Sequence, residues 1–458
     1  MENVWKKYND EDINKLNDVC DDYRKFISIS KIEREVIKNA IAIAENSGFV
    51  NLDVCIEENR RLDPGDKIYV NNRGKSLALF IIGKEDITNG INILGAHVDS
   101  PRLDLKANPL YEDSEFAYLD THYYGGIKKY QWVTIPLALH GVVVKKNGEV
   151  INVVIGEDES DPVVGITDLL PHLGSEQMKK EASKVIEGEG LDVLIGSMPI
   201  DDSKDEELVK KNIMQILKNK YYIEDGDFLS AEIEVVPAGK ARDFGLDRSM
   251  IMAYGQDDKV CAYASLRAFL DCPPCDKTIS CILVDKEEIG SVGATGMQST
   301  FYENAILEMC NLMGHTENTA LPRTLTNSYM LSSDVNAAYD PLYADVMDKR
   351  NASYFNQGVV FCKYTGSRGK SGSNDANAEF VAKLRNIMDN HDVHFQISEL
   401  GKVDAGGGGT IAYILANKNV NVIDCGVGVL SMHAPWEVTA KSDIYEAYKC
   451  YVSFLQDA

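Results

Sequence analysis

The chain has 458 residues, and a soft prior of about 150 residues per domain predicts two or three domains. Hydrophobic residues make up 44% and charged residues 26% of the sequence, as in ordinary globular proteins, which argues against wholesale disorder. The formal net charge of -24 argues against binding a phosphate backbone, because that affinity comes mainly from Lys and Arg.

The N-terminal stretch Met1 to Lys25 is polar and acidic and lacks the apolar segment of a secretory signal. No apolar run approaches the ~20 residues that a membrane-spanning helix needs. The ten cysteines lie at scattered spacings, which is typical of reduced thiols in a cytosol. Cys272-Pro273-Pro274-Cys275 has the spacing of a redox or zinc pair, but no second pair accompanies it, so a loop at a helix end is favoured. We therefore expect a cytoplasmic protein without membrane or nucleic-acid partners.

The first predicted element is a helix that begins at a capping box of Ser30 and Glu33 and ends at Gly48. Short apolar strands and further helices follow at wide intervals. The strands are expected at residues 77–82, 91–95, 278–284 and 420–430, and the helices at 259–270 and 376–388. This alternation predicts an α/β domain that is split across the sequence.

Between the two halves the pattern changes to alternating, β-rich sequence. Strands are expected at 149–155 and 231–236, with one helix at 206–219. We therefore predict a catalytic domain made of residues 1–104 and 239–458, with residues 105–238 inserted as a second domain.

The candidate metal ligands lie just beyond predicted strands, where an α/β sheet presents its loops to a ligand. His97 and Asp99 are two residues apart, so in extended backbone both side chains point to one face. His97 can bind metal, and Asp99 can orient a neighbouring ligand. Taken alone, this pair is more often an ordinary surface pair.

Two acidic pairs follow later in the chain. Asp257 and Asp258 precede a predicted helix, so either could also serve as its N-cap. Glu287 and Glu288 come directly after the strand at 278–284 and cannot both point the same way. One can ligate metal while its neighbour takes a proton from water.

Asp334 and His433 add a third acid and a second imidazole after further apolar segments. Carboxylates and imidazoles without thiolate suit a hydrolytic zinc, manganese or cobalt site better than a closed structural zinc site. If two ions share the site, one carboxylate must bridge them, and Asp257 is the chosen bridge.

Together, these segments and their order resemble the M18 family of metallo-aminopeptidases, which includes aspartyl aminopeptidases. The resemblance covers nearly the whole chain. It implies a mixed-sheet zinc-peptidase catalytic domain with an inserted β-rich dimerisation domain. It also implies Glu287 as general base, Asp99 beside the metals, and substrate or additional metal contacts from His172 and Lys363. The implied metal ligands are His97, Asp257, Glu288, Asp334 and His433.

The same resemblance implies a metal-dependent aminopeptidase that removes the N-terminal residue of peptides by attack of a bridging metal-bound water. Two divalent ions are expected, zinc in the first place, with Co²⁺ or Mn²⁺ as alternatives. A homo-oligomer is implied, built from dimers into a tetrahedral dodecamer. The alternatives are a deacylase or carboxypeptidase on the same scaffold and a non-catalytic oligomeric binding protein.

The sequence departs from the better-known family members where they recognise acidic N-terminal residues. Asn356 stands near a family His, although Lys363 matches a nearby substrate-binding Lys. The glycine run Gly406 to Gly409 follows and could either face an anion with backbone N–H groups or simply be flexible. We therefore predict broad or neutral N-terminal specificity.

Overall fold

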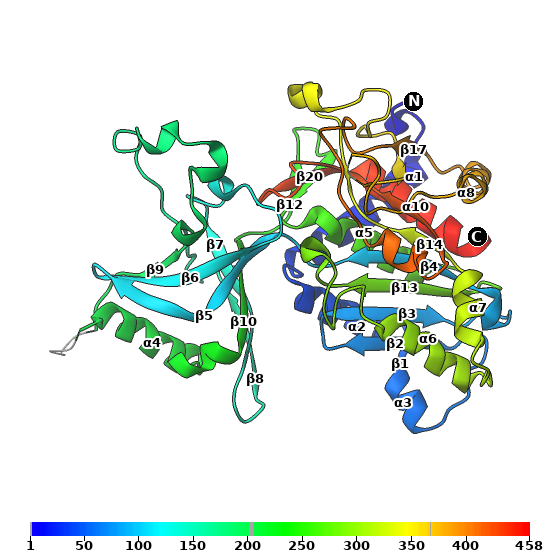
Figure 1. Ribbon diagram of the computed structural model, residues 1–458, viewed down its shortest axis with the longest axis horizontal. Coiled ribbons are helices and arrows are strands. Elements are labelled where there is room, and N and C mark those ends of the chain that lie inside the picture. The colour runs from blue at the N-terminus through cyan, green and yellow to red at the C-terminus, as the bar shows by residue number, and fades with distance from the viewer. Residues whose placement is uncertain (1, 201–205, 367) are drawn as a thin grey trace. The chain divides into compact units, whose positions relative to one another are not determined.

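The computed structural model describes residues 2–200, 206–366 and 368–458. Contacts divide the chain into two compact units (Figure 1). The first unit comprises the described residues of 1–99, 241–432 and 437–458, and the second comprises the described residues of 100–240 together with 433–436. None of the helices in the described ranges combines the length and apolar character needed to span a bilayer.

A nine-stranded mixed sheet forms the centre of the first unit, in the order β1-β2-β3-β13-β4-β14-β18-β16-β17. The strand β4 runs parallel to both of its neighbours, β13 and β14. The carboxyl ends of these three strands therefore reach the same edge of the sheet. The strands are β1 (Val50–Asn51), β2 (Lys67–Asn72), β3 (Ser76–Ile81), β4 (Ile91–His97), β13 (Thr278–Val284), β14 (Tyr329–Ser332), β16 (Val359–Cys362), β17 (Phe395–Ser398) and β18 (Asn421–Gly426).

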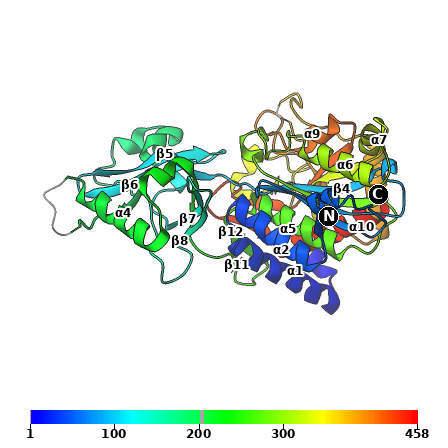
Figure 2. The same ribbon diagram turned by 90° about the horizontal axis from the view of Figure 1, so that it is seen from below.

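Helices cover both faces of this sheet, and each face has its own hydrophobic core. In β3, Leu77 and Leu79 belong to one core, whereas Ala78 and Phe80 belong to the other, because successive side chains point to opposite faces. Figure 2 shows α1, α2, α5 and α10 on one side and α6, α7 and α9 on the other. The first core contains α1 (Asp10–Ser28), α2 (Glu33–Asn46), α5 (Gln256–Asp271), α8 (Ala378–Asn390) and α10 (Lys441–Asp457), and the second contains α3 (Leu52–Glu57), α6 (Phe301–Leu312), α7 (Ala320–Thr326) and α9 (Ala412–Ala416).

A five-stranded sheet completes the first unit, in the order β11-β12-β20-β19-β15. The single strand expected at 420–430 is wrong, because β18 ends at Gly426 and β19 begins at Gly428 in this other sheet. A Cβ on Gly426 would lie 1.9 Å from the carbonyl oxygen of Asp334, so glycine lets the chain pass close to that backbone as it changes sheets. The strands are β11 (Arg242–Phe244), β12 (Met250–Ala253), β15 (Asn336–Ala337), β19 (Gly428–Leu430) and β20 (Glu437–Ala440).

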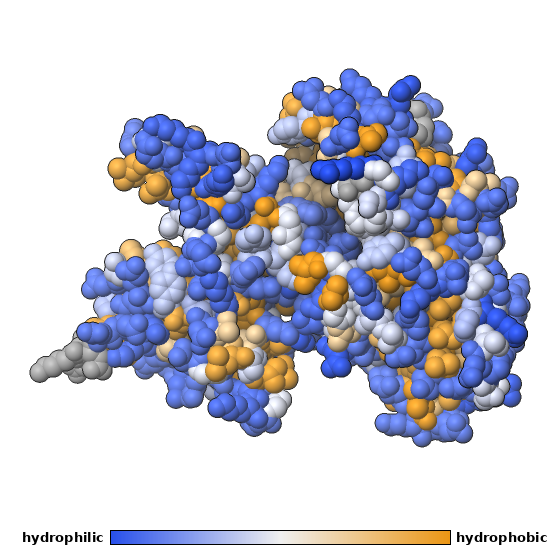
Figure 3. All heavy atoms as spheres, viewed as in Figure 1, coloured by the Kyte–Doolittle hydropathy of each residue, from blue (hydrophilic) through white to orange (hydrophobic). Residues whose placement is uncertain are grey.

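The second unit is built on a six-stranded antiparallel sheet in the order β8-β7-β10-β5-β6-β9. The helix α4 (Leu208–Tyr221) contacts β5, β6 and β9. Hydrophilic side chains cover most of the face of each unit that Figure 3 shows, in keeping with the net charge of -24. The strands are β5 (Arg102–Asp113), β6 (Phe116–Tyr124), β7 (Leu137–Val144), β8 (Val150–Ile155), β9 (Val193–Gly196) and β10 (Ala231–Pro237).

The expected capping box of Ser30 and Glu33 is wrong. The helix α2 has Ile32 as its N-cap, and the carboxylate of Glu35 accepts the backbone N–H of Lys31 at 2.8 Å. Glu33 is instead buried, with its carboxylate 3.1 Å from the Lys75 ammonium. A tertiary ion pair therefore uses the side chain that the local pattern assigned to the cap.

One buried acid in the central sheet makes stability depend on pH. Burial raises the pKa of Asp424 in β18 to about 7, whereas an unfolded Asp titrates near about 3.9. The Asp424 carboxyl therefore binds its proton more tightly in the folded chain than in the unfolded chain. Protonation of Asp424 contributes its full stabilisation below about pH 4, and this stabilisation is lost as the pH rises to about 7. Asp424→Asn should raise the free energy of unfolding by roughly 1–4 kcal/mol at about pH 8 and leave it unchanged at about pH 4.

Thermal unfolding of both proteins across this pH range measures the effect. The exposed Asp53→Asn is the matched control and should follow the parent curve. An Asp424→Asn curve parallel to that of the parent at every pH would contradict the assignment.

Candidate metal centre

His97 is the last residue of β4 and is 1% exposed. Its Nε2 lies 3.1 Å from Asp257 Oδ1 and 4.0 Å from Asp334 Oδ1. Its Nδ1 lies 3.1 Å from the carbonyl oxygen of Asp99. With the other ring nitrogen held by Asp99, Nε2 faces two carboxylates that come from distant parts of the sequence.

Asp257 lies at the start of α5, joined to Asp258 by a cis peptide bond. The N-cap of this helix is Gly255, so neither aspartate serves as the cap. The backbone N–H of Asp257 donates to Glu437 Oε2 at 3.1 Å, and Glu437 is 1% exposed. The strand β20 thus fixes the backbone of Asp257 from the neighbouring sheet.

Asp334 follows the end of β14 by two residues. In the parallel pairing of β14 with β4, Ser332 lies opposite Gly95, and the N–H of Ser333 donates to the Gly95 carbonyl at 2.5 Å. Strand register therefore carries Asp334 to the end of β4. Ligand atoms of His97, Asp257 and Asp334 all lie within 4.8 Å of one another, as a shared metal ion requires.

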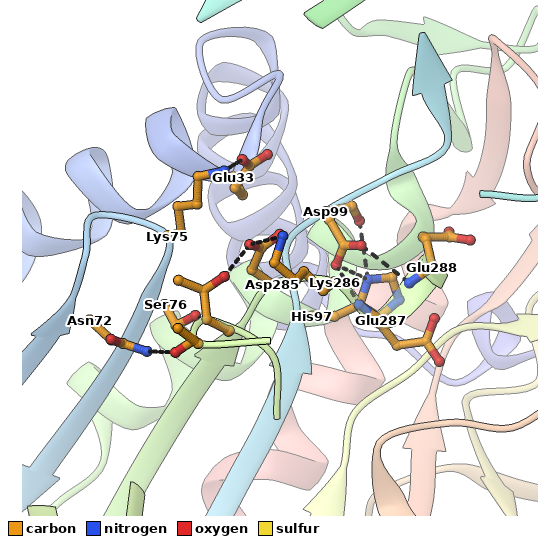
Figure 4. A network of polar contacts seen from close by, with 12 residues as sticks. Glu33, Asn72, Lys75, Ser76, His97, Asp99, Asp285, Lys286, Glu287 and Glu288 are labelled. Carbon is orange, nitrogen blue, oxygen red and sulfur yellow. Dashed lines mark hydrogen bonds and ion pairs between the residues drawn. The ribbon is translucent and has the colours of Figure 1, made fainter. Parts of the chain in front are cut away.

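Glu287 and Glu288 lie in a 3-10 turn (Glu287–Ile289) that follows β13 (Figure 4). The two carboxylate oxygens of Asp99 accept their backbone N–H groups, Oδ1 from Glu287 at 3.1 Å and Oδ2 from Glu288 at 3.2 Å. Ligand atoms of Glu288 and Asp257 lie within 4.8 Å of each other. Asp99 therefore holds the glutamate turn with its side chain and the His97 ring with its backbone carbonyl.

The electrostatics of this cluster suit a divalent cation. Burial alone would lower the pKa of His97, but the carboxylates of Asp257 and Asp99 raise it well above its usual value. Burial, reinforced by the charge of Asp258, raises the pKa of Asp334 well above normal. These carboxylates crowd around one imidazole, and a cation would neutralise their mutual repulsion. Oxygen and nitrogen donors without thiolate fit zinc, manganese or cobalt.

The remaining predicted site residues are His433, His172 and Lys363. His433 belongs to the short segment that clusters with the second unit, where its Nδ1 lies 2.9 Å from the Gly126 carbonyl oxygen. His172 is exposed on a turn of the second unit. Lys363 is 42% exposed, with its ammonium 3.2 Å from Asp375.

Asn356 and the glycine run Gly406 to Gly409 are the segments that the sequence analysis connected with substrate recognition. Asn356 Oδ1 accepts from Trp5 Nε1 at 2.8 Å and from Ser442 Oγ at 2.9 Å, so this amide is engaged in packing the N-terminal segment. The glycine run Gly406 to Gly409 precedes α9, which has only five residues. A single helical turn of this length offers little dipole to an anion.

Sequence reasoning missed the positioning role of Glu437. It stands at the first position of β20, fully inside the protein, and its backbone carbonyl also accepts from Gln256 Nε2 at 2.7 Å. The available signal was a charged residue at the start of a short strand, but the partner of Glu437 lies 180 residues away in the chain.

The two hydrogen bonds to Asp99 make a quantitative prediction. In Asp99→Asn only one side-chain oxygen can accept, so either Glu287 or Glu288 loses its backbone partner. We expect kcat/KM to fall by about 10–100-fold, the usual cost of removing a group that supports metal ligands. Peptide turnover and bound metal should be measured against the exposed control Asp389→Asn. Full turnover in Asp99→Asn would refute this role.

Comparison with known proteins places this geometry in a family. Residues 26–455 match the family described as aminopeptidase I zinc metalloprotease (M18). A probable M18 family aminopeptidase 1 of Clostridium acetobutylicum is 57% identical over 99% of this chain and 98% of its own. Among solved structures, the M18 aminopeptidase of Thermotoga maritima has a TM-score of 0.95 with 44% identity, covering 100% of this chain and 99% of its own.

A more distant structure, the S. cerevisiae mApe1 dodecamer, has a TM-score of 0.76 with 20% identity, covering 96% of this chain and 97% of its own, and shares the fold. The family match spans most of the chain, and the near relatives cover it from end to end. The chain therefore belongs to the M18 family of zinc metalloproteases and is a metal-dependent aminopeptidase with a two-domain α/β peptidase fold.

Proposed function

We propose that this aminopeptidase binds two divalent ions, zinc in the first place, at the carboxyl edge of its nine-stranded sheet. The observation that carries the proposal is the convergence of His97, Asp257 and Asp334 within ligand distance, with Glu288 close to Asp257. We assign Asp257 as the bridging ligand because its carboxylate lies near donors on both sides.

We propose His433 as the remaining ligand. Its immediate chain neighbour, Met432, belongs to the first unit, as does Glu437, whose carboxylate holds the backbone of Asp257. The chain extends at most about 3.5 Å per residue, so the distance from His433 to Met432 and to Glu437 is limited by the few residues between them. Its imidazole also matches the nitrogen and oxygen chemistry of the other donors.

Two ions held by these residues would supply Lewis acidity toward the scissile carbonyl and would lower the pKa of water. The chain's own residues do the rest. Glu287, held by Asp99 but not assigned as a ligand, takes a proton from the attacking water and returns it to the leaving amine. Asp99 fixes the glutamate turn, and Glu437 fixes the backbone of Asp257.

The test is turnover of a panel of aminoacyl-anilides by metal-loaded protein, with N-acetylated versions as controls. An aminopeptidase hydrolyses the free-amine series and spares the acetylated one. Preference for the acetylated substrates would favour a deacylase, and release of C-terminal residues from peptides would favour a carboxypeptidase. Metal analysis that finds two ions per chain supports the binuclear centre, and a single ion refutes it.

Specificity should be broad or neutral. An acidic side chain in the substrate pocket needs charged or multiple polar partners, because a buried carboxylate without them is heavily penalised. Lys363 already faces Asp375 at 3.2 Å, and Asn356 is engaged with Trp5. We therefore expect kcat/KM for Glu-anilide to be no more than about tenfold above that for Leu-anilide, or roughly 1.4 kcal/mol. An advantage of a hundredfold or more would contradict this.

We also propose a cytosolic homo-oligomer in which residues 105–238 mediate dimerisation. The dodecameric state of the distantly related mApe1 supports a similar assembly here. His172 is exposed in the second unit and would be available to a neighbouring subunit's substrate. Native mass measurement tests the assembly, and a monomer at working concentration would refute it.

A further inference from the structure

A pair of cysteines lies at the end of α5 farthest from Asp257. This helix ends at Asp271, Cys272 is its C-cap, and Pro273 and Pro274 lead to Cys275 before β13 begins. Neither proline has a backbone N–H, and both have fixed φ, so the turn that joins the two cysteines is stiff. The Sγ atoms of Cys272 and Cys275 lie 3.5 Å apart.

Cys272 and Cys275 are the cysteines that a reagent in solution can reach. All ten cysteines of the chain are free thiols, and eight of them are buried, whereas Cys272 and Cys275 are partly exposed. Both cysteines line a surface cavity of about 360 Å³, together with Lys67 and Lys84. A second close pair, Cys425 and Cys450 at 3.8 Å, is buried and offers a reagent no entry.

We propose that Cys272 and Cys275 form a reversible redox site that exchanges with low-molecular-weight disulfides bearing carboxylate groups. Closing the bond requires the Sγ atoms to approach from 3.5 Å to about 2.05 Å, which rotation of two partly exposed side chains can supply. The lysines of the cavity match the carboxylates of such a reagent, although Asp276 pairs with one of them, Lys84, at 2.9 Å.

Cys275 is the attacking group. The hydrogen bond shared by the two Sγ atoms lowers the pKa of Cys275 and, together with burial, raises the pKa of Cys272. The Cys275 thiol also donates to the carbonyl oxygen of Pro273 at 3.2 Å. The Cys275 thiolate attacks the reagent R–S–S–R, forming a mixed disulfide and expelling one R–S⁻. The Cys272 thiol then loses its proton to solvent and attacks Cys275 Sγ, expelling the second R–S⁻. Two protein thiols are oxidised, and the reagent is reduced to two thiols.

The position in the fold favours a disulfide that persists once formed. A strongly oxidising disulfide arises when the reduced thiolate is stabilised, as it is at a helix N-terminus. Here Cys272 lies at the C-terminus of a 16-residue helix, where the helix dipole opposes negative charge. The carboxylates of Asp276 and Asp457 oppose negative charge on Cys275, although the hydrogen bond with Cys272 outweighs them in setting the pKa of Cys275.

A metal-binding role is less suited to this pair. A structural zinc site usually has four ligands, and the pair supplies two. Among the described residues, the groups of three or more donors that could share an ion contain only His, Asp and Glu. The pair therefore lacks the neighbours that a closed metal site needs.

The experiment equilibrates the full-length, metal-loaded protein with mixtures of reduced and oxidised glutathione, followed by acid quench, alkylation and peptide mass spectrometry. We expect the peptide that contains Cys272 and Cys275 to lose two hydrogens in one two-electron step while the other eight cysteines remain alkylatable after unfolding. Bound metal and aminopeptidase turnover are followed in the same samples, so failure of the redox site is distinct from failure of the catalytic proposal.

Two variants separate the roles. Cys272→Ser should leave Cys275 as a stable mixed disulfide with glutathione, and Cys275→Ser should react at least about tenfold more slowly because Cys272 remains protonated. A pair that stays reduced at equilibrium with excess oxidised glutathione would overturn the proposal. A second result would also overturn the proposal. If the parent protein binds one more equivalent of zinc than the Cys272→Ser/Cys275→Ser variant, and this zinc protects both thiols from alkylation, the pair is a metal site.

Discussion

Replacement of Glu287 by Gln should lower kcat by at least about 100-fold while the protein keeps its bound metal. The amide has nearly the shape of the carboxylate but cannot accept a proton from water. The backbone N–H of residue 287 can still donate to Asp99, because that contact does not involve the side chain. The turn and the neighbouring Glu288, which is the proposed ligand, should therefore stay in place.

The measurements are initial rates on a Leu-anilide and metal content by elemental analysis. Glu308→Gln, on the exposed side of α6, is the matched control and should behave as the parent protein. A Glu287→Gln enzyme that turns over at the parent rate would remove Glu287 from the role of general base. A variant that loses its metal would make Glu287 a ligand instead.

Replacement of Asp257 by Asn should have a larger effect. If Asp257 holds both ions as proposed, the substitution would replace a negatively charged ligand by an amide, which offers one neutral oxygen and an NH₂ group that repels a cation. Loss of the Lewis acid interaction with the substrate, worth several kcal/mol, should lower kcat/KM by about 10³-fold or more. If the centre is binuclear as proposed, bound metal should fall from two ions per chain to one or none.

The Asp257→Asn variant should nevertheless fold, because the backbone N–H of residue 257 still donates to Glu437. Circular dichroism checks this, and the exposed Asp389→Asn is the control for the chemical change itself. Retention of two ions together with high activity would show that another carboxylate bridges, and Asp258, fully buried beside it, would be the first alternative.

The sequence by itself determined the elements whose signals are local. The strand expected at 278–284 has the same limits as β13, because a mainly apolar run flanked by polar residues is sufficient to specify a strand buried on both faces. The donor types were equally visible, since a His, an Asp or a Glu directly after such a strand is read from single segments. The family resemblance then depended on their order along the chain, and the M18 match confirmed that family.

Only the tertiary structure decided which of these polar side chains meet. His97, Asp257 and Asp334 are brought together by the register of β4 with β14 and by the start of α5, although 77 residues or more separate any two of them in the chain. The same cause explains the errors and omissions. Glu33 pairs with Lys75 and does not form the expected capping box, and residues 420–430 belong to strands of two different sheets. The carboxylate of Glu437 accepts a hydrogen bond from the backbone N–H of Asp257. Each of these outcomes depends on long-range pairing, which a local pattern of residues does not contain.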